Sequence, residues 1–547
     1  MKATQTKISM LRLAWILTGA GLIGWPTTVM AGDPVAVWHA DGSAEDSSGK
    51  GNHGAAIGTS RFAQGLSGQA FELNGLDEAI KTAIDTQVDK ANAQSDSNSE
   101  WPQWRGPERN GAASFSPTLA NAWPPNGPKK IWSSKPVSIT PGPYAGGHSS
   151  PVIAGGKVYQ YVADREGRHD IVMCLDAAHG TTKWTRRFEA PYKLMHGASA
   201  TPCIVDNRVY IMGGRNAYCL DANTGTTVWL RVPLMTLAPN FPGDYLQEVS
   251  SSFVVGEGVA AVVVDKCAGL DLATGKTLWT TPSPGGYALA MTSPAFWSHE
   301  GQKYLIYGGT LRMCCVNPSN GNVVWEVTGD GQGGDHAHTP VVLDDYLICF
   351  WQGKLGIYRV SLDGPQCLYE APMADKHSSP IAFKNRVYFV GCPDRISSTA
   401  VVCYNLETGE LIWSHSVKNP EYSSPFLADN KIFLLTDQGK RLAMLDALNG
   451  KLLGECPIDA KPWASPAFAM GCLFVRKHDD GISCYDLTAK NNVSPRNKPA
   501  FAIKASASNV YQGMEEYAAE QAFDGDAGTR WATDDGTHQA WIAAEFS

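Results

Sequence analysis

Imidazole, carboxylate and aromatic side chains gather in short stretches that precede a recurring Ser/Thr-Pro step. Five of the chain's 13 histidines lie in these stretches. Neutral imidazole is a common metal ligand and can act as a general base near neutral pH. We therefore take these stretches as candidate binding sites. Their candidate residues are His148, His196, Glu248, Asp335, His338, His377, Tyr422 and Trp463.

One stretch holds several metal-ligating side chains. Asp335, His336 and His338 lie within four positions, and alternation along an extended chain places both histidines on one side. That geometry does not specify a third ligand. A histidine before a Ser-Pro step can also donate a hydrogen bond to a neighbouring carbonyl. The sequence leaves both interpretations open, a ligand site and the satisfaction of strand ends.

Other catalytic signatures are absent from the sequence. It contains no His-Glu-x-x-His helix, no Gly-x-Ser-x-Gly elbow, no phosphate loop and no Cys-x-x-Cys-His motif. The last absence excludes a covalently attached c-type haem in this chain.

A repeated hairpin must position the candidate residues. Five segments such as LDANTGTTVW run through an Asp or Asn and a Gly turn to a tryptophan, once every 40 to 50 residues in most of the chain. Tyr369 and Gly454 replace the tryptophan in two further copies, and GPKKIW supplies another before the first copy. We expect these tryptophans to pack between neighbouring units. They are Trp132, Trp184, Trp229, Trp279, Trp325 and Trp413.

A second repeated signal gives the number of units. A Ser/Thr-Pro step opens a short apolar strand seven times, because proline needs no ladder donor at the first residue of a strand. Phe253 in SSSF takes the same place once. The prolines are Pro151, Pro202, Pro294, Pro340, Pro380, Pro425 and Pro466. Eight units of four strands predict an all-β, eight-bladed β-propeller. The last unit lacks a strand, so we predict that strand 129–134 pairs with it and closes the ring.

The D-x-x-T-G-x-x-x-W copies resemble the repeat of the pyrroloquinoline quinone (PQQ) family, which includes quinoprotein dehydrogenases and BamB-like assembly proteins. The resemblance covers about residues 101–490. It implies the propeller fold and, as an alternative function, a PQQ-dependent alcohol or sugar dehydrogenase with calcium. Asp335, Glu248 and Trp351 are the candidates for that cofactor site. Some quinoproteins also carry a disulfide between adjacent cysteines, which raises the question for Cys314 and Cys315.

The two ends of the chain differ from the repeats. Residues 1–31 have the charge and apolar pattern of a signal peptide, which predicts export. Residues 32–90 resemble part of a laminin-G or concanavalin-like lectin domain, through DSSGKGNHG and GLSGQAFELNG. Residues 502–547 are similar to the start of a discoidin (coagulation factor type C) domain, through AFDGDAGTRWAT. Residues 91–100 and 491–501 are linkers in this interpretation.

Composition narrows the range of partners. The chain has 45 basic and 53 acidic residues and a net charge of −8, which argues against nucleic acid. Most of the 13 cysteines follow the repeat and are expected to be buried apolar residues rather than disulfides. No second long apolar segment indicates a membrane span. We therefore expect a noncatalytic, exported scaffold that binds a protein or glycan in the periplasm or outside the cell, without a cofactor.

Overall fold

A computed structural model describes most of the repeat region and parts of both ends. The described residues are 61–64, 69–72, 100–124, 126–137, 147–164, 168–190, 193–194, 199–231, 245–246, 249–285, 292–309, 311–330, 338–371, 377–391, 400–417, 423–489, 504–514, 517–519, 532, 534 and 542–545.

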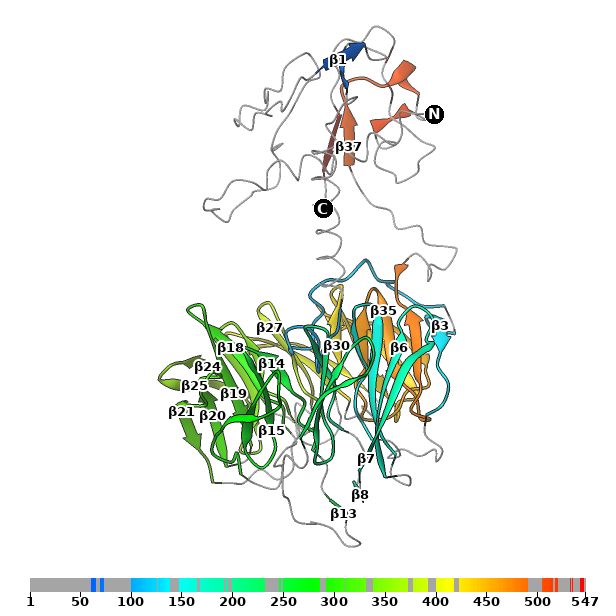
Figure 1. Ribbon diagram of the computed structural model, residues 1–547. Coiled ribbons are helices and arrows are strands. Elements are labelled where there is room, and N and C mark those ends of the chain that lie inside the picture. Colours follow the sequence, from blue (N-terminus) through cyan, green and yellow to red (C-terminus); the bar gives the residue numbers. More distant parts are fainter. Residues whose placement is uncertain are drawn as a thin grey trace. The chain divides into compact units, whose positions relative to one another are not determined.

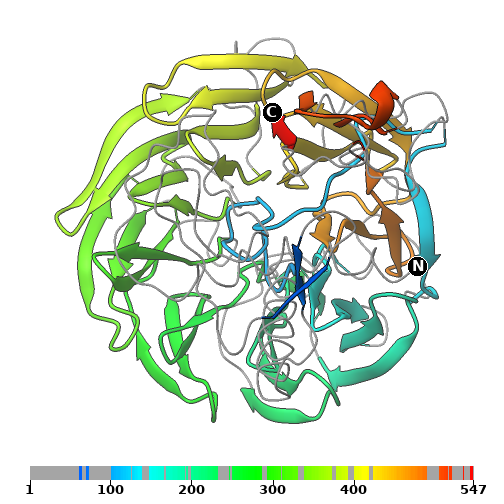
Figure 2. The same ribbon diagram turned by 90° about the horizontal axis from the view of Figure 1, so that it is seen from above.

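Eight four-stranded antiparallel sheets form a closed ring, which Figure 2 shows along its axis. Blade 1 contains β4 (Val152–Ala154), β5 (Lys157–Asp164), β6 (His169–Asp176) and β7 (Thr182–Glu189). Blade 2 contains β9 (Cys203–Val205), β10 (Arg208–Met212), β11 (Ala217–Asp221) and β12 (Thr227–Arg231). Blade 3 contains β14 (Val254–Gly256), β15 (Val259–Val263), β16 (Cys267–Asp271) and β17 (Thr277–Thr280). Blade 4 contains β18 (Ala295–His299), β19 (Gln302–Gly308), β20 (Arg312–Val316) and β21 (Val323–Thr328).

The second half of the ring repeats this order (Figure 1). Blade 5 contains β22 (Val341–Leu343), β23 (Tyr346–Trp351), β24 (Lys354–Ser361) and β25 (Gly364–Ala371). Blade 6 contains β26 (Ile381–Phe383), β27 (Arg386–Gly391), β28 (Ala400–Asn405) and β29 (Leu411–Ser416). Blade 7 contains β30 (Phe426–Ala428), β31 (Lys431–Thr436), β32 (Arg441–Asp446) and β33 (Leu452–Pro457). Blade 8 contains β34 (Ala467–Ala469), β35 (Cys472–Arg476), β36 (Ile482–Asp486) and, from far earlier in the chain, β3 (Lys129–Ser133).

The early strand β3 closes the ring, which confirms the sequence prediction. It pairs antiparallel with β36, and Trp132 lies opposite Cys484. The indole nitrogen of Trp132 donates to the carbonyl of Ala177 in blade 1, at 2.9 Å. The first and last blades are therefore joined by both a strand and a side chain.

The burial pattern of the outer strands explains why the repeat needs its tryptophan. β12, with the sequence TVWLR, exposes every residue except Trp229. The strand before it, β11, is buried at four of five positions. Trp229 lies opposite Cys219, at a register shift between Cys219 and Leu220. The small thiol side chain leaves room for the indole.

The same pairing recurs around the ring and accounts for most of the repeated cysteines. Cys174, Cys315 and Cys403 also lie opposite tryptophans. Cys314 and Cys315 are both buried free thiols. Because side chains alternate along β20, Cys314 packs into the cluster shared with blade 3 and Cys315 into the cluster shared with blade 5.

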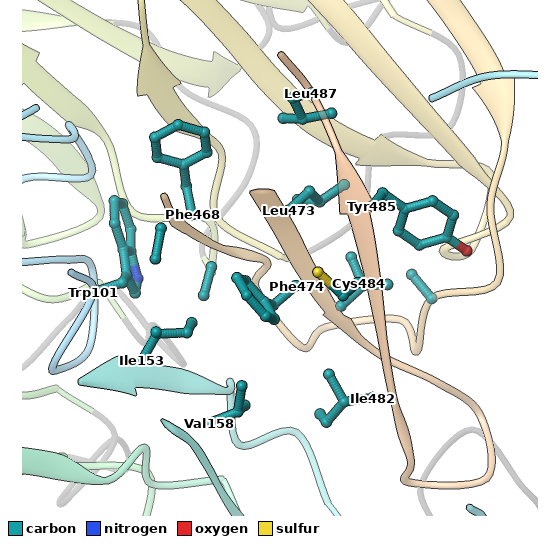
Figure 3. Packing of buried hydrophobic residues seen from close by; sticks show 14 of the residues in the cluster. Trp101, Ile153, Val158, Phe468, Leu473, Phe474, Ile482, Cys484, Tyr485 and Leu487 are labelled. Carbon is teal, nitrogen blue, oxygen red and sulfur yellow. The ribbon is translucent and has the colours of Figure 1, made fainter. Parts of the chain in front are cut away.

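The core lies between neighbouring blades. The cluster between blades 7, 8 and 1 includes Phe468 and Phe474 with Ile153 (Figure 3). Trp101, which precedes β3 by 28 positions, packs into this cluster, with its ring centroid 6.1 Å from that of Phe426. A segment before the repeats thus contributes to the core.

Contacts divide the chain into two units. One spans Thr86–Lys498 and contains the ring. The other combines Met1–Asp85 with Pro499–Ser547. In this second unit β1 (Arg61–Gln64) pairs with β2 (Gln69–Glu72), and β37 (Lys504–Ala507) pairs with β38 (Ile542–Glu545). A short 3-10 helix, η1, spans Tyr511–Gly513.

Most of residues 1–99 and 490–547 lies outside the described residues. The signal peptide, the two flanking resemblances and the linkers therefore stay predictions. Within the described part, no helix is long and apolar enough to cross a bilayer.

The parallel pair β8 (Lys193–Leu194) and β13 (Tyr245–Leu246) links the connections that follow blades 1 and 2.

Candidate functional site

A belt of hydrogen bonds links neighbouring blades at the Ser/Thr-Pro steps. At six of the eight junctions between blades, the residue before the proline, or before Phe253, uses its backbone N–H to donate to the hydroxyl of the equivalent residue in the next blade. Ser150 donates to Thr201 at 3.1 Å, and Thr201 donates to Ser252 at 2.8 Å. Ser424 likewise donates to Ser465 at 2.8 Å. The remaining links run from Ser252 to Ser293, from Thr339 to Ser379 and from Ser379 to Ser424. The Ser or Thr hydroxyl thus links neighbouring blades, whereas the proline that follows it opens the inner strand.

A segment before the repeats crosses the channel on one side of this belt. We call residues 101–113 the crossing segment, and Figure 2 shows it in light blue inside the ring. Its backbone pairs with the free edges of inner strands. Trp101 exchanges two hydrogen bonds with Ile153 in blade 1, and Leu427 in blade 7 bonds to both Gly111 and Ala113. The segment therefore covers edges that would otherwise stay unpaired.

Two arginines anchor the crossing segment through backbone carbonyls. The Arg105 guanidinium donates to Pro425 O at 2.6 Å and also to Pro380 O. Arg109 donates to Phe253 O at 3.0 Å. Burial lowers the pKa of Arg105 to about 9 and that of Arg109 to about 10. Both values lie above neutral pH, so carbonyl dipoles compensate two buried positive charges.

A small cavity remains between the belt and the crossing segment. Its volume is about 10 Å³, room for roughly one water molecule. It is lined by Trp101, Trp104, Arg105, Ser150, Ser424, Pro425, Ser465 and Pro466. At this level the side chains of Trp104 and Arg105 reach across to Thr339, Pro380 and Pro425 in blades 5, 6 and 7.

Three of the predicted residues come together on the other side of the belt. Trp463, His148 and His377 each stand three positions before the proline or its equivalent, in blades 8, 1 and 6. The ring centroids of His148 and Trp463 are 4.8 Å apart. Those of His377 and Trp463 are 6.2 Å apart, with the rings 18° from parallel. We call these three residues the mouth cluster.

The backbone at the centre of this cluster is strained. Trp463 has φ of +71°, a left-handed conformation that is a true outlier for a bulky residue. Such a conformation costs roughly 1–2 kcal/mol and persists only where the surroundings impose it. Trp463 is partly exposed, whereas His148 is 8% exposed. A strained, partly exposed indole between two imidazoles is a candidate binding surface.

A buried ion triad lies beneath the mouth cluster. The Lys461 ammonium and the Arg476 guanidinium both contact one carboxylate oxygen of Asp480, at 2.5 and 2.7 Å. The side chains of all three are fully buried. Burial, followed by the nearby Arg476 charge, lowers the pKa of Lys461 to about 8. Sequence reasoning missed this triad.

The other predicted site residues divide into two groups. His338 is buried and packs on Phe350, with ring centroids 5.3 Å apart. His196, Glu248, Asp335, His336 and Tyr422 lie outside the described residues. The proposed metal at Asp335, His336 and His338 thus stays a prediction. Among the residues that the structure does describe, no group of three or more His, Cys, Asp or Glu could hold a metal ion.

The repeat tryptophans lie against the following blade. Trp184 donates to Ala222 O at 3.1 Å, and its ring occupies the place where Gly225 would carry a Cβ. Trp229, Trp279 and Trp413 make equivalent bonds to Leu272, Pro318 and Ala447. Tyr369 uses its hydroxyl instead, on Asn405 O. In blade 7, where Gly454 replaces the tryptophan, Trp123 packs beside that glycine from the segment before β3.

The described residues considered for a quinone site do not converge at the mouth. Trp351 ends β23 and packs against the cluster between blades 4 and 5. Cys314 and Cys315 point into two different interblade clusters. These residues do not fit a quinone pocket in the channel.

The comparisons with known proteins agree with this architecture. A tetrathionate hydrolase from Acidithiobacillus ferrooxidans is 22% identical over 410 residues, covering 68% of this chain and 71% of that protein. Two solved structures share the fold. The quinohemoprotein alcohol dehydrogenase from Comamonas testosteroni is 12% identical, with a TM-score of 0.51, covering 80% of this chain and 86% of that one. A europium-containing methanol dehydrogenase is 12% identical, with a TM-score of 0.50, covering 71% and 91%.

The family comparison extends over the propeller. Overlapping matches span residues 121–285, 168–390 and 356–454. Together they cover well over half of the sequence, and so this chain belongs to the family described as outer membrane protein assembly factor BamB.

Proposed function

We propose that this protein is an exported, noncatalytic binding propeller whose ligand, a glycan or a protein segment, docks on the mouth cluster. The observation that carries the proposal is Trp463, held in a strained conformation with its ring against His148 and His377. Strained residues gather at ligand sites because the fold must impose them. An indole face binds the apolar face of a sugar ring or an aliphatic side chain.

The limited space inside the ring favours a ligand site at the surface over one in the channel. The crossing segment and the belt leave a cavity for about one water molecule. A ligand at this level would have to displace Trp101 or Trp104. The mouth cluster needs no such displacement, because Trp463 and His377 are already partly exposed.

A panel of ligands on the full chain tests this proposal. Thermal unfolding is followed with neutral and acidic oligosaccharides and with extended peptides, since a ligand that binds only the folded state raises the unfolding midpoint. The shift should be lost in Trp463→Leu. It should be kept in Tyr346→Leu, which removes a partly exposed aromatic from the rim of blade 5. Equal shifts in both variants would refute a site at the mouth.

A quinone-dependent dehydrogenase is the alternative, because two solved enzymes named as methanol and alcohol dehydrogenases have this fold. It requires that added PQQ with calcium give a bound chromophore and dye-linked oxidation of an alcohol or sugar. The relative named tetrathionate hydrolase adds tetrathionate to the substrates to be tried. Robust turnover of any of these would overturn the noncatalytic proposal.

A further inference from the structure

The loop that carries the mouth cluster is held from below by buried charges. Lys461 precedes Trp463 by two residues, and its ammonium contacts Asp480. Its backbone N–H also donates to Arg476 O at 2.6 Å. The side chain and main chain of Lys461 are therefore both fixed to the β35–β36 hairpin of blade 8.

The same ion triad also fixes the backbone next to His148. Arg476 donates to Asp480 through Nε at 2.8 Å, and through another nitrogen to Ser149 O at 3.0 Å. Ser149 follows His148 directly. The imidazole Nδ1 of His148 lies 3.3 Å from Pro462 O, the residue before Trp463. One triad thus fixes the backbone of both rings that meet at the mouth.

We infer that Lys461, Asp480 and Arg476 are positioning residues that hold Trp463 and His148 in their ring contact and so preorganise the ligand surface. This inference rests on the proposed function for its role, since it deepens the account of the same site. Removing Asp480 takes the shared carboxylate away from two buried cations, and removing Lys461 or Arg476 takes away one of the contacts that fix this loop and the backbone at Ser149. The loop 461–463 would then relax toward an ordinary backbone conformation and move the indole.

The position of the indole can be measured without a ligand. The Trp463 ring current displaces the NMR signals of nearby imidazole protons, and selective 13C labelling of the 13 histidines resolves them in the full chain. Trp463→Leu identifies the displaced signals of His148 and His377. In Lys461→Met and Asp480→Asn these signals should move most of the way to their Trp463→Leu positions.

Matched variants separate positioning from general destabilisation. Lys431→Met removes another buried lysine, paired with Asp429 at 2.7 Å in blade 7, and should leave the signals of His148 and His377 unchanged. Arg476→Lys keeps the charge and should displace the His148 signal, because the bond to Ser149 is weakened. This milder variant carries the test if Lys461→Met does not fold.

The outcomes distinguish this inference from the proposed function. Wild-type histidine signals in Lys461→Met, Asp480→Asn and Arg476→Lys would overturn the positioning role. If the signals move but no ligand is found, the positioning role stands and the proposed function falls. With a ligand from the panel, Lys461→Met should weaken binding about tenfold, and affinity equal to wild type would also overturn the inference.

Discussion

The indole of Trp463 and the imidazole of His148 lie 4.8 Å apart between ring centroids, although 315 positions separate them in the chain. Ring closure makes them neighbours, because blade 8 packs against blade 1. The candidate site therefore depends on the closing strand β3 as much as on its own residues.

Docking of the repeat tryptophans should depend on the acceptor that each indole finds. Trp184 donates to Ala222 O, whereas Trp325 Nε1 is buried without an acceptor among the described residues. Blade 5 offers a tight hairpin at Asp363 and Gly364 instead of the longer turn. Trp184→Phe should cost about 1–2 kcal/mol more than Trp325→Phe, because the first loses an indole hydrogen bond, whereas the second removes a buried N–H that has no acceptor among the described residues. Denaturant unfolding of both variants measures the difference, and equal losses would contradict this account.

The glycine after each Asp-x-x-Thr should be needed both for its positive φ and because a Cβ there would overlap the tryptophan of the preceding blade. Gly225 has φ of +69°, and a Cβ there would lie 2.7 Å from the Trp184 ring. Gly156 has φ of +66° with no atom within 4 Å of the added Cβ. Gly156→Ala should cost roughly 1 kcal/mol for the backbone alone. Gly225→Ala should cost roughly 1–3 kcal/mol more, as overpacking does. Similar unfolding free energies for the two variants would show that the indole can move away.

The crossing segment should stabilise the ring through its buried arginines. Arg105→Met removes donors from Pro380 O and Pro425 O, and the loss should be about 2–5 kcal/mol of unfolding free energy. Arg386 also bonds two carbonyls, those of Ala447 and Leu448, but on the surface. Arg386→Met should change the unfolding free energy by less than about 1 kcal/mol. Comparable losses in the two variants would mean that the crossing segment does not support the ring.

The lowered pKa of Lys461 should make the free energy of unfolding depend on pH in the alkaline range. Its pKa is about 8 in the folded chain, below the ordinary value of 10.5. Between these values the unfolded chain binds the proton and the folded chain does not, so stability rises with pH from 8 to 10.5 and is lost again as pH falls. The difference in unfolding free energy between wild type and Lys461→Met should rise by about 3 kcal/mol over this window. A constant difference would contradict the lowered pKa.

The sequence predicts the ring well because its signals repeat. Eight strand openings and the tryptophan hairpins predict eight blades, and the strand missing from the last unit predicts β3 as its partner. The cysteines opposite Trp184 and Trp229 also follow the register. Repetition could have revealed the hydroxyl belt, since a Ser or Thr precedes every proline. The proline alone accounts for the strand opening but not for the hydroxyl that precedes it.

The rest of the site depends on features that occur once. The crossing segment binds largely through backbone groups, which carry no sequence signal, and Arg105 reaches residues 275 and 320 positions away. The left-handed backbone of Trp463 is imposed by tertiary contacts against its local preference. Lys461 and Asp480 lie in two polar loops of the sequence, and tertiary packing rather than the local sequence buries them.

The most direct test of the account locates the ligand on the protein. The full chain, labelled with 13C at histidine, is titrated with the oligosaccharide or peptide that raises its unfolding midpoint most. The account predicts that the signals of His148 and His377 move with the ligand concentration, while those of His179 in blade 1 and His299 in blade 4, which lie at turns away from the mouth cluster, stay fixed. Movement at His179 and His299 alone, with His148 and His377 unchanged, would contradict it.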